Sequence, residues 1–124
     1  MKNMPQISEA ELEVMKILWE LEKATSSQII ERLTQTTDWK PKTIQTLITR
    51  LASKNAINTE KINSKAFIYS PIVNEDEYKR FANKSFLQKV YNGSLNLMIA
   101  SFLKEKKLTK KEIDDLKRLL EEEV

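Results

Sequence analysis

The segment from Pro41 to Asn55, PKTIQTLITRLASKN, restricts the fold of this 124-residue chain more than any other stretch. Its aliphatic side chains recur at i, i+3, i+4 and i+7, which is the spacing of one narrow stripe on an α-helix. Pro41 suits the first position of such a helix, because the N–H that proline lacks would have no partner there. The segment therefore predicts a helix that packs one face on a core. The stripe consists of Ile44, Leu47, Ile48 and Leu51.

The opposite face of this helix carries no acidic side chain. A face that merely contacts water usually mixes both signs of charge, whereas Lys, Arg, Thr and Gln can contact phosphates and base edges. Residues 39–72 hold six Lys or Arg against the single acid Glu60, although the net charge of the whole chain is only +3. Such clustering favours nucleic-acid binding, and a solvated face is the alternative. The face comprises Lys42, Thr43, Gln45, Thr46, Thr49, Arg50 and Ser53.

Two stretches nearer the start of the chain also predict amphipathic helices. Residues 8–21 have a broad apolar face, and Ser8 with Glu11 three residues later matches a capping box. Residues 26–35 have a narrower stripe, with Ser26 as the expected N-cap. We therefore expect two helices before the one that Pro41 opens.

A β-hairpin is expected after the third helix. Residues 56–62 and 66–70 are rich in β-branched and aromatic side chains, and the short connection 63–65 separates them. Three helices followed by a hairpin is the order of a winged helix-turn-helix, in which the third helix enters the DNA major groove. The sequence thus predicts a mainly α fold, with a winged-helix DNA-binding domain of three helices plus a β-hairpin wing at residues 1–72.

Residues 73–124 are expected to form a second domain of three helices. Asn74 and Thr109 are candidate N-caps, and Gly93 is the expected left-handed residue at a helix end. About fifty residues rarely bury enough apolar surface to be stable alone, so we expect this domain to pair with a second copy; folding back on the first domain is the alternative. The expected dimerisation residues are Tyr78, Phe81, Phe86, Val90, Leu95, Met98, Ile99, Phe102, Ile113, Leu116 and Leu120.

The composition excludes several chemistries. The chain has no histidine, no cysteine and one glycine, which excludes imidazole bases, thiolate nucleophiles, disulfides, the usual zinc ligands and glycine-rich phosphate loops. We predict a protein that is not an enzyme and has no metal or other cofactor. The first residues lack the apolar block of a signal peptide, and no apolar run is long enough to span a bilayer, which favours a cytoplasmic location.

Three stretches resemble the penicillinase repressors, the BlaI/MecI family. DWKPKTIQTLITRLASKNAI is similar to the family's W-x-P-K-T-[IV]-x-T-[LY]-[IL]-x-R-L signature, SEAELEVMKILWE resembles its first helix, and the stretch from SFLQKVYNG onward resembles its dimerisation half. The resemblance covers essentially the whole chain. It implies a homodimeric winged-helix repressor on a palindromic operator with TACA/TGTA-type half-sites, of the type that controls β-lactamase and β-lactam resistance genes.

The resemblance also implies which side chains meet DNA. Lys42, Thr43, Thr46 and Arg50 fall where the family's recognition helix contacts its operator. We expect Thr43 and Thr46 at base edges, where a threonine methyl can contact a thymine methyl. Lys42 and Arg50 are expected mainly on phosphates, although an arginine can also read guanine. Further backbone contacts are expected from Lys65 at the wing tip and from Thr25 and Ser26 at the start of the second helix.

Induction in the family follows β-lactam sensing by a membrane receptor-protease, after which the repressor is cut in its dimerisation half. A cut there weakens DNA binding, because the second half-site is no longer linked to the first. The family's Asn–Phe cleavage pair reads Ser101–Phe102 here. The resemblance therefore implies a possible cleavage site at this pair and a membrane sensor-protease as partner, with a different cut, another protease or no cut as alternatives. The copper-responsive relatives carry a Cys-x-Cys motif that this chain lacks, so metal sensing of that kind is excluded.

Other function classes compete with a resistance repressor. A repressor of unrelated genes without proteolytic induction fits the same residues. A winged helix that docks a protein needs exposed apolar anchors, and the outer face of residues 42–53 has none. A hydrolase would need a carboxylate constellation, but Glu9, Glu11 and Glu13 are more simply the solvated and capping face of the first helix.

Overall fold

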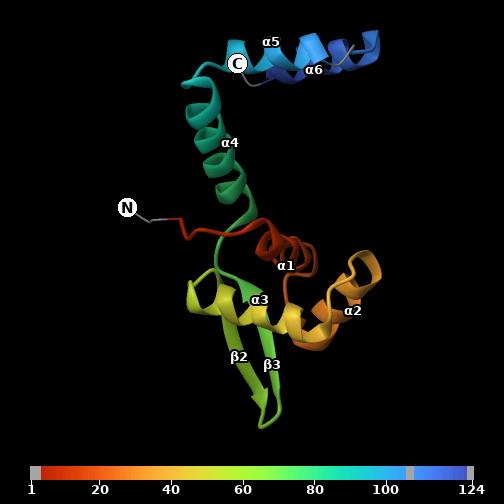
Figure 1. Cartoon of the computed structure of the whole chain (residues 1–124), viewed down its shortest axis with the longest axis vertical. Helices are drawn as coiled ribbons and strands as arrows, with labels where there is room; N and C mark the ends of the chain where they lie inside the picture. Colours follow the sequence, from red (N-terminus) through yellow and green to blue (C-terminus); the bar gives the residue numbers. More distant parts are fainter. Residues whose placement is uncertain (1–3, 106–107, 123–124) are drawn as a thin grey trace. The chain divides into compact units, whose positions relative to one another are not determined.

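The computed structural model describes residues 4–105 and 108–122, apart from the side chains of Leu120 and Glu122 (Figure 1). The chain divides into two compact units, one up to Phe81 and one from Ala82 onward. The first unit contains α1 (Glu9–Leu21), β1 (Ala24–Thr25), α2 (Ser26–Thr36), α3 (Pro41–Ser53), β2 (Ile57–Asn63) and β3 (Ala66–Pro71). The division falls within α4 (Glu75–Tyr91), and the second unit continues with α5 (Leu95–Glu105) and α6 (Lys110–Glu122). The predicted mainly α, winged-helix fold is confirmed.

Capping side chains define where the first two helices begin. Ser8 and Glu11 form the predicted capping box, with Ser8 Oγ accepting from the Glu11 N–H at 3.1 Å and Glu11 Oε1 accepting from the Ser8 N–H at 2.9 Å. The predicted cap of α2 is wrong by one residue. Thr25 is the N-cap, because Gln28 three residues later completes a box with it, and Ser26 is the first helical residue.

The sheet has three antiparallel strands in the order β1-β3-β2. The predicted hairpin is β2–β3, with Thr59 opposite Tyr69 and an irregularity between Lys61 and Asn63. It projects beyond the helices of the first unit (Figure 1). Strand β1 was not predicted, because two residues show no periodicity and form a strand only through pairing with β3. This pairing ties the start of α2 to the base of the wing.

The core of the first unit lies between its three helices and the base of the sheet. The predicted stripe of α3 is buried, with exposures of 0 to 5%. This burial turns the acid-free face of α3 outward, since the two faces lie on opposite sides of one helix. The other buried apolar side chains are Val14, Met15, Ile17, Leu18, Ala24, Ile29, Leu33, Ala56, Ile57, Tyr69 and Val73.

The start of α4 is anchored to this core. Trp19 Nε1 donates to the Val73 carbonyl at 2.8 Å, and the Trp19 and Tyr78 ring centroids lie 5.7 Å apart. The Asn74 side chain accepts from the N–H groups of Asp76 and Glu77, which confirms it as a cap. Tyr78, expected in a dimer interface, thus has a contact within its own chain, and its part in a dimer stays a prediction.

The helix ends of the second unit follow the predicted signals. Gly93 has a φ of +84°, and its N–H donates to the Leu87 carbonyl at 3.1 Å, which closes the end of α4. Thr109 and Glu112 form the predicted capping box at the start of α6. None of the described helices is long and apolar enough to cross a membrane.

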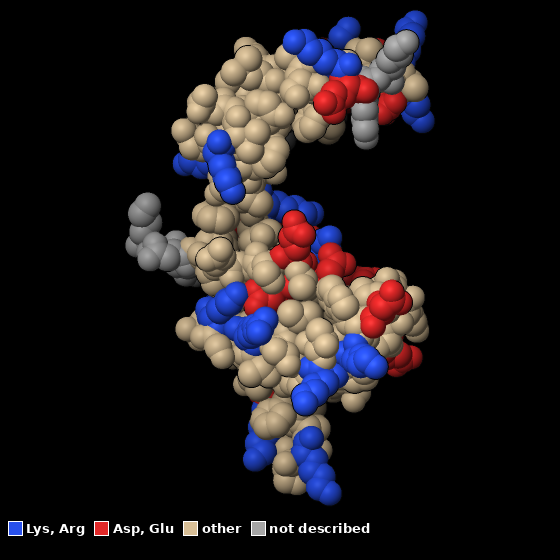
Figure 2. Space-filling view, viewed as in Figure 1, with Lys and Arg blue, Asp and Glu red and all other residues tan. Residues whose placement is uncertain are grey.

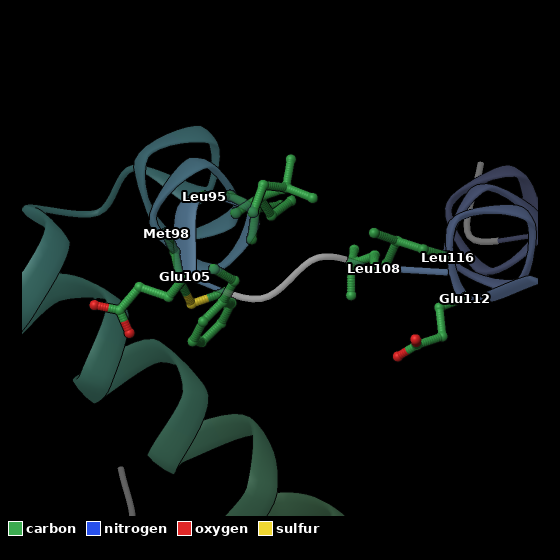
Figure 3. Close-up of a pocket in the computed structure, with 9 residues that line it drawn as sticks. Leu95, Met98, Glu105, Leu108, Glu112 and Leu116 are labelled. Carbon is green, nitrogen blue, oxygen red and sulfur yellow. The ribbon is translucent and has the colours of Figure 1, made fainter. Parts of the chain in front are cut away.

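The second unit leaves many of its apolar side chains exposed. No side chain of α4 or α5 is buried, and Phe86, Leu97 and Phe102 are 47%, 57% and 53% exposed. Side chains between Leu95 and Leu116, which are mostly apolar but include Glu105 and Glu112, line an open groove with a volume of about 640 Å³ (Figure 3). The side chain of Leu120, expected in the same interface, lies outside the described residues.

Candidate nucleic-acid interface

The outer face of α3 presents polar and basic side chains to solvent. Lys42, Thr43, Thr46 and Arg50 are all exposed, while the stripe on the other side holds the helix on the core. Figure 2 shows Lys and Arg side chains over α3 and the hairpin, and Asp and Glu side chains over α1 and α2. The structure therefore brings the four expected helix contacts together on one accessible, acid-free face.

Hydrogen bonds orient three hydroxyl groups on this face. Thr46 Oγ1 donates to the Lys42 carbonyl, Thr49 Oγ1 to the Gln45 carbonyl and Ser53 Oγ to the Thr49 carbonyl, each at 3.0 Å. Because the one donor proton of each hydroxyl points into the helix, only its lone pairs can accept from a ligand. Adenine N6 and cytosine N4 amino groups are the matching donors in the major groove.

Thr49 is a residue of this face that the expected contact set left out. It is exposed, and it lies two turns after Lys42 and one turn after Thr46 along the helix. Helical periodicity could have identified it, because the line directly opposite the buried stripe runs through these three positions. The contacts implied by the family resemblance include Lys42 and Thr46 from this line and Thr43 and Arg50 from the neighbouring one, but not Thr49.

The wing presents both charge and apolar surface. Lys65 is exposed in the hairpin turn, where its N–H donates to Asn63 Oδ1 at 2.9 Å. Ile62 and Phe67 near the tip are 54% and 41% exposed, and sequence reasoning did not single them out. Lys61 lies opposite Phe67 in the strand register. The wing can therefore offer cations to phosphates and apolar side chains to sugars or base edges.

The side chains at the start of α2 are less available to a DNA phosphate than the other expected contacts. Thr25 Oγ1 accepts from the Gln28 N–H and donates to Gln28 Oε1 at 3.3 Å, so its hydroxyl already serves the capping box. Thr25 and Ser26 are both half-buried. A phosphate contact at Thr25 would compete with the capping bonds, and the roles of both residues stay predictions.

A buried acid lies behind the interface. Glu11 is only 2% exposed, so the expected solvated acidic face on α1 is wrong at this residue, although its capping role holds. Lys54 Nζ, from the residue after α3, donates to Glu11 Oε1 at 2.6 Å and to the Gln6 carbonyl at 2.7 Å. Burial raises the pKa of Glu11, but hydrogen bonds from Lys54 and Ser8 and the charge of Lys54 outweigh it, so the pKa is lowered. Glu11 is thus an ionised, paired carboxylate at neutral pH.

Known proteins match this chain over nearly its whole length. The penicillinase repressor family model matches residues 7–122. The penicillinase repressor of Bacillus licheniformis is 43% identical over 98% of this chain and 94% of its own. The methicillin resistance regulatory protein MecI of Staphylococcus aureus strain N315 is 42% identical over 93% of each chain.

A solved structure matches the fold as well. The solution structure of monomeric Bacillus licheniformis BlaI in complex with the blaP half-operator has a TM-score of 0.54 and 45% identity. It covers 63% of this chain and 94% of that one. That relative binds half-operator DNA as a monomer, so a single copy of its fold suffices for contact with one half-site.

Proposed function

The chain belongs to the penicillinase repressor family, and on this premise we propose that it acts as a homodimer on a palindromic operator, which it reads with α3 and the wing. Members of the family are DNA-binding regulators and not enzymes. The observation that carries the proposal is the outer face of α3. It is acid-free and accessible, and the buried stripe on the opposite side of the helix turns it outward.

The side chains of this face suit distinct parts of a duplex. Lys42 and Arg50 supply charge for phosphates, and Arg50 can also pair with guanine O6 and N7. Thr43 and Thr46 supply methyl groups for thymine, and the oriented hydroxyl of Thr46 can accept from an amino group. Lys65 would bind the backbone beside the groove. Recognition thus combines charge for affinity with small side chains for specificity.

The second unit supports the dimer. The expected interface side chains on α4 and α5 include exposed aromatic and aliphatic groups that water solvates poorly. A twofold dimer has two recognition helices, which suits the two halves of a palindrome, whose half-sites lie about one helical turn apart or a multiple of it. The second half-site then binds at the high effective concentration that the link provides.

We propose that the regulated genes are those of β-lactamase or β-lactam resistance. The support is the names of the relatives, which are a penicillinase repressor and a methicillin resistance regulator. Induction would follow a cut at Ser101–Phe102 by a membrane sensor-protease. Phe102 is 53% exposed on α5, and a cut there would separate α6 from the rest of the dimerisation domain. A repressor of other genes that is never cut is the alternative, and an uncut chain after incubation with such a protease would favour it.

The DNA-binding test compares two single-charge variants by fluorescence anisotropy on a palindromic duplex with TACA/TGTA half-sites. Arg50→Ala should weaken operator binding by about tenfold or more, since loss of a base or phosphate contact costs about 1–3 kcal/mol. Lys16→Ala is the matched control, because it removes one positive charge from the exposed surface of α1. Equal affinities of the two variants would contradict the role of Arg50.

Salt dependence tests the partner class in the same assay. Affinity for the operator should fall steeply between about 50 and 200 mM salt, because phosphate binding releases counterions. A flat salt response would favour a protein partner over DNA.

A further inference from the structure

The Glu11–Lys54 pair joins two segments that are far apart in the sequence. Glu11 lies in the first turn of α1, and Lys54 is the C-cap of α3, 43 positions later. The same ammonium reaches the Gln6 carbonyl in the segment that leads into α1. We call Glu11, Lys54 and the Gln6 carbonyl the clasp. It links the end of the recognition helix to the start of α1.

The rest of α3 is held mainly by apolar packing. The stripe of four aliphatic side chains buries α3 on the core, and burial of this kind is strong but has little directional preference. A hydrogen-bonded ion pair does have directional preference, since its donor and acceptor must meet at one distance and angle. The clasp therefore constrains the position of α3 along its axis and about it, which the stripe alone does not.

Backbone hydrogen bonds connect the clasp to the last turn of α3. The Lys54 N–H donates to the Arg50 carbonyl at 3.0 Å, and the Ala56 N–H donates to the Leu51 carbonyl at 3.0 Å. Asn55 between them has a φ of 61°, the left-handed conformation that ends a helix. Because Lys54 is hydrogen-bonded to the last turn of α3, a shift of its ammonium moves the turn that carries Arg50.

We propose that Glu11 is a positioning residue for DNA recognition: through Lys54 it holds α3 at the height and rotation at which Lys42, Thr46 and Arg50 meet the groove. The inference rests on the proposed function. Ion pairs of this kind often add little stability over apolar replacements, and in some proteins they specify one arrangement among several. The clasp therefore contributes more to sequence discrimination than to folding.

The test uses the double variant E11Q/K54M. Gln at position 11 still accepts from the Ser8 N–H and so keeps the capping box, while Met removes the ammonium but retains an unbranched apolar stem. One charge of each sign is lost, so the net charge and the long-range attraction to DNA are unchanged. The matched control is E13Q/K16M, which removes an exposed ion pair from α1 and also preserves the net charge.

Affinities are measured for the operator duplex and for a scrambled duplex of equal length, at a temperature where circular dichroism shows each variant folded. We expect E11Q/K54M to lose operator affinity by about tenfold, the effect of one mismatched base pair, with scrambled-duplex affinity unchanged. A merely structural role would lower both affinities together. An operator-to-scramble ratio within about twofold of the E13Q/K16M control would overturn the proposal.

Two further measurements separate the possible failures. If E11Q/K54M does not fold, K54M alone is measured, because it removes the donor of both clasp hydrogen bonds and leaves the Ser8–Glu11 capping box in place. An operator-to-scramble ratio equal to that of the wild type would then overturn the proposal. If the wild type itself does not prefer the operator, the proposed function fails. The effect of the clasp on the position of α3 is then tested by NMR on the protein without DNA. Amide NMR shifts of α3 should then change from Arg50 back to Lys42 in E11Q/K54M, and shifts confined to Lys54 and its neighbours would overturn it.

Discussion

The two units of this chain contain similar kinds of apolar side chain but differ in how far they bury them. In α3 the stripe Ile44, Leu47, Ile48 and Leu51 is almost wholly buried, whereas α5 is more apolar than α3 on average and buries none of its side chains. The first unit has a core made by three helices and a sheet, and it can hold a rigid recognition face. The second unit presents exposed apolar surface, which the proposed dimer would cover. Apolar content alone therefore does not distinguish a core from an interface.

The largest expected effect comes from two matched truncations, one in the core of the first unit and one on the exposed surface of the second. Leu51→Ala, at a site with no exposure, should lower the free energy of unfolding of the first unit by about 2–5 kcal/mol, because it leaves a cavity. Leu97→Ala, at a 57% exposed site on α5, should change it by about 0.5 kcal/mol or less. Urea unfolding followed by tryptophan fluorescence measures this, since both tryptophans, Trp19 and Trp39, lie in the first unit. Similar losses in the two variants would remove the contrast.

The second test asks whether the exposed surface of α4 is an interface. Phe86→Asp should raise the dimer dissociation constant by about a hundredfold or more, because an unpaired buried charge costs about 3 kcal/mol or more. Analytical ultracentrifugation measures the dissociation constant. Asn83→Asp is the control, because it places the same carboxylate at an exposed polar position of the same helix. Equal dissociation constants for the two variants would exclude Phe86 from the interface.

The smallest expected effect concerns pH and the first unit alone. The pKa of Glu11 is lowered in the folded chain from its ordinary value of 4.5. The stabilisation from this carboxylate is therefore complete above that value and is lost as the pH falls through the lower, folded pKa. The unfolding free energy of the wild type should decrease below about pH 4.5 more steeply than that of Glu11→Gln. Urea titrations at several pH values measure both slopes, and parallel curves would show that Glu11 does not contribute.

Much of the candidate DNA-binding face could be predicted from local sequence patterns. The spacing of the α3 stripe identified the buried face, and with it the outward direction of Lys42, Thr46 and Arg50. Ser8, Asn74, Gly93 and Thr109 marked helix ends correctly, because a capping bond joins residues only a few positions apart. Thr25 could have been identified in the same way, since Gln28 completes its box, but the adjacent Ser26 was chosen instead.

Other features depend on contacts between distant segments. Strand β1 exists because Ala24 and Thr25 pair with Tyr69 and Ile68, more than forty positions later. Tyr78 has the spacing of an interface residue, yet its ring lies beside Trp19, whose indole also binds the Val73 carbonyl just before α4. No local pattern could assign either contact.

The amino-acid sequence by itself determined the helices, the hairpin and the acid-free face of α3, because periodicity and capping act between residues that are near in the chain. Only the tertiary structure decided which base pairs with the buried acid. The capping box distinguishes Glu11 from Glu9 and Glu13 in the sequence, but nothing near it in the chain identifies Lys54 as its partner. Packing of α1 against the end of α3 excludes water from Glu11 and brings Lys54 to it from 43 positions away. Burial and charge pairing depend on distance in space, and the folded core sets that distance.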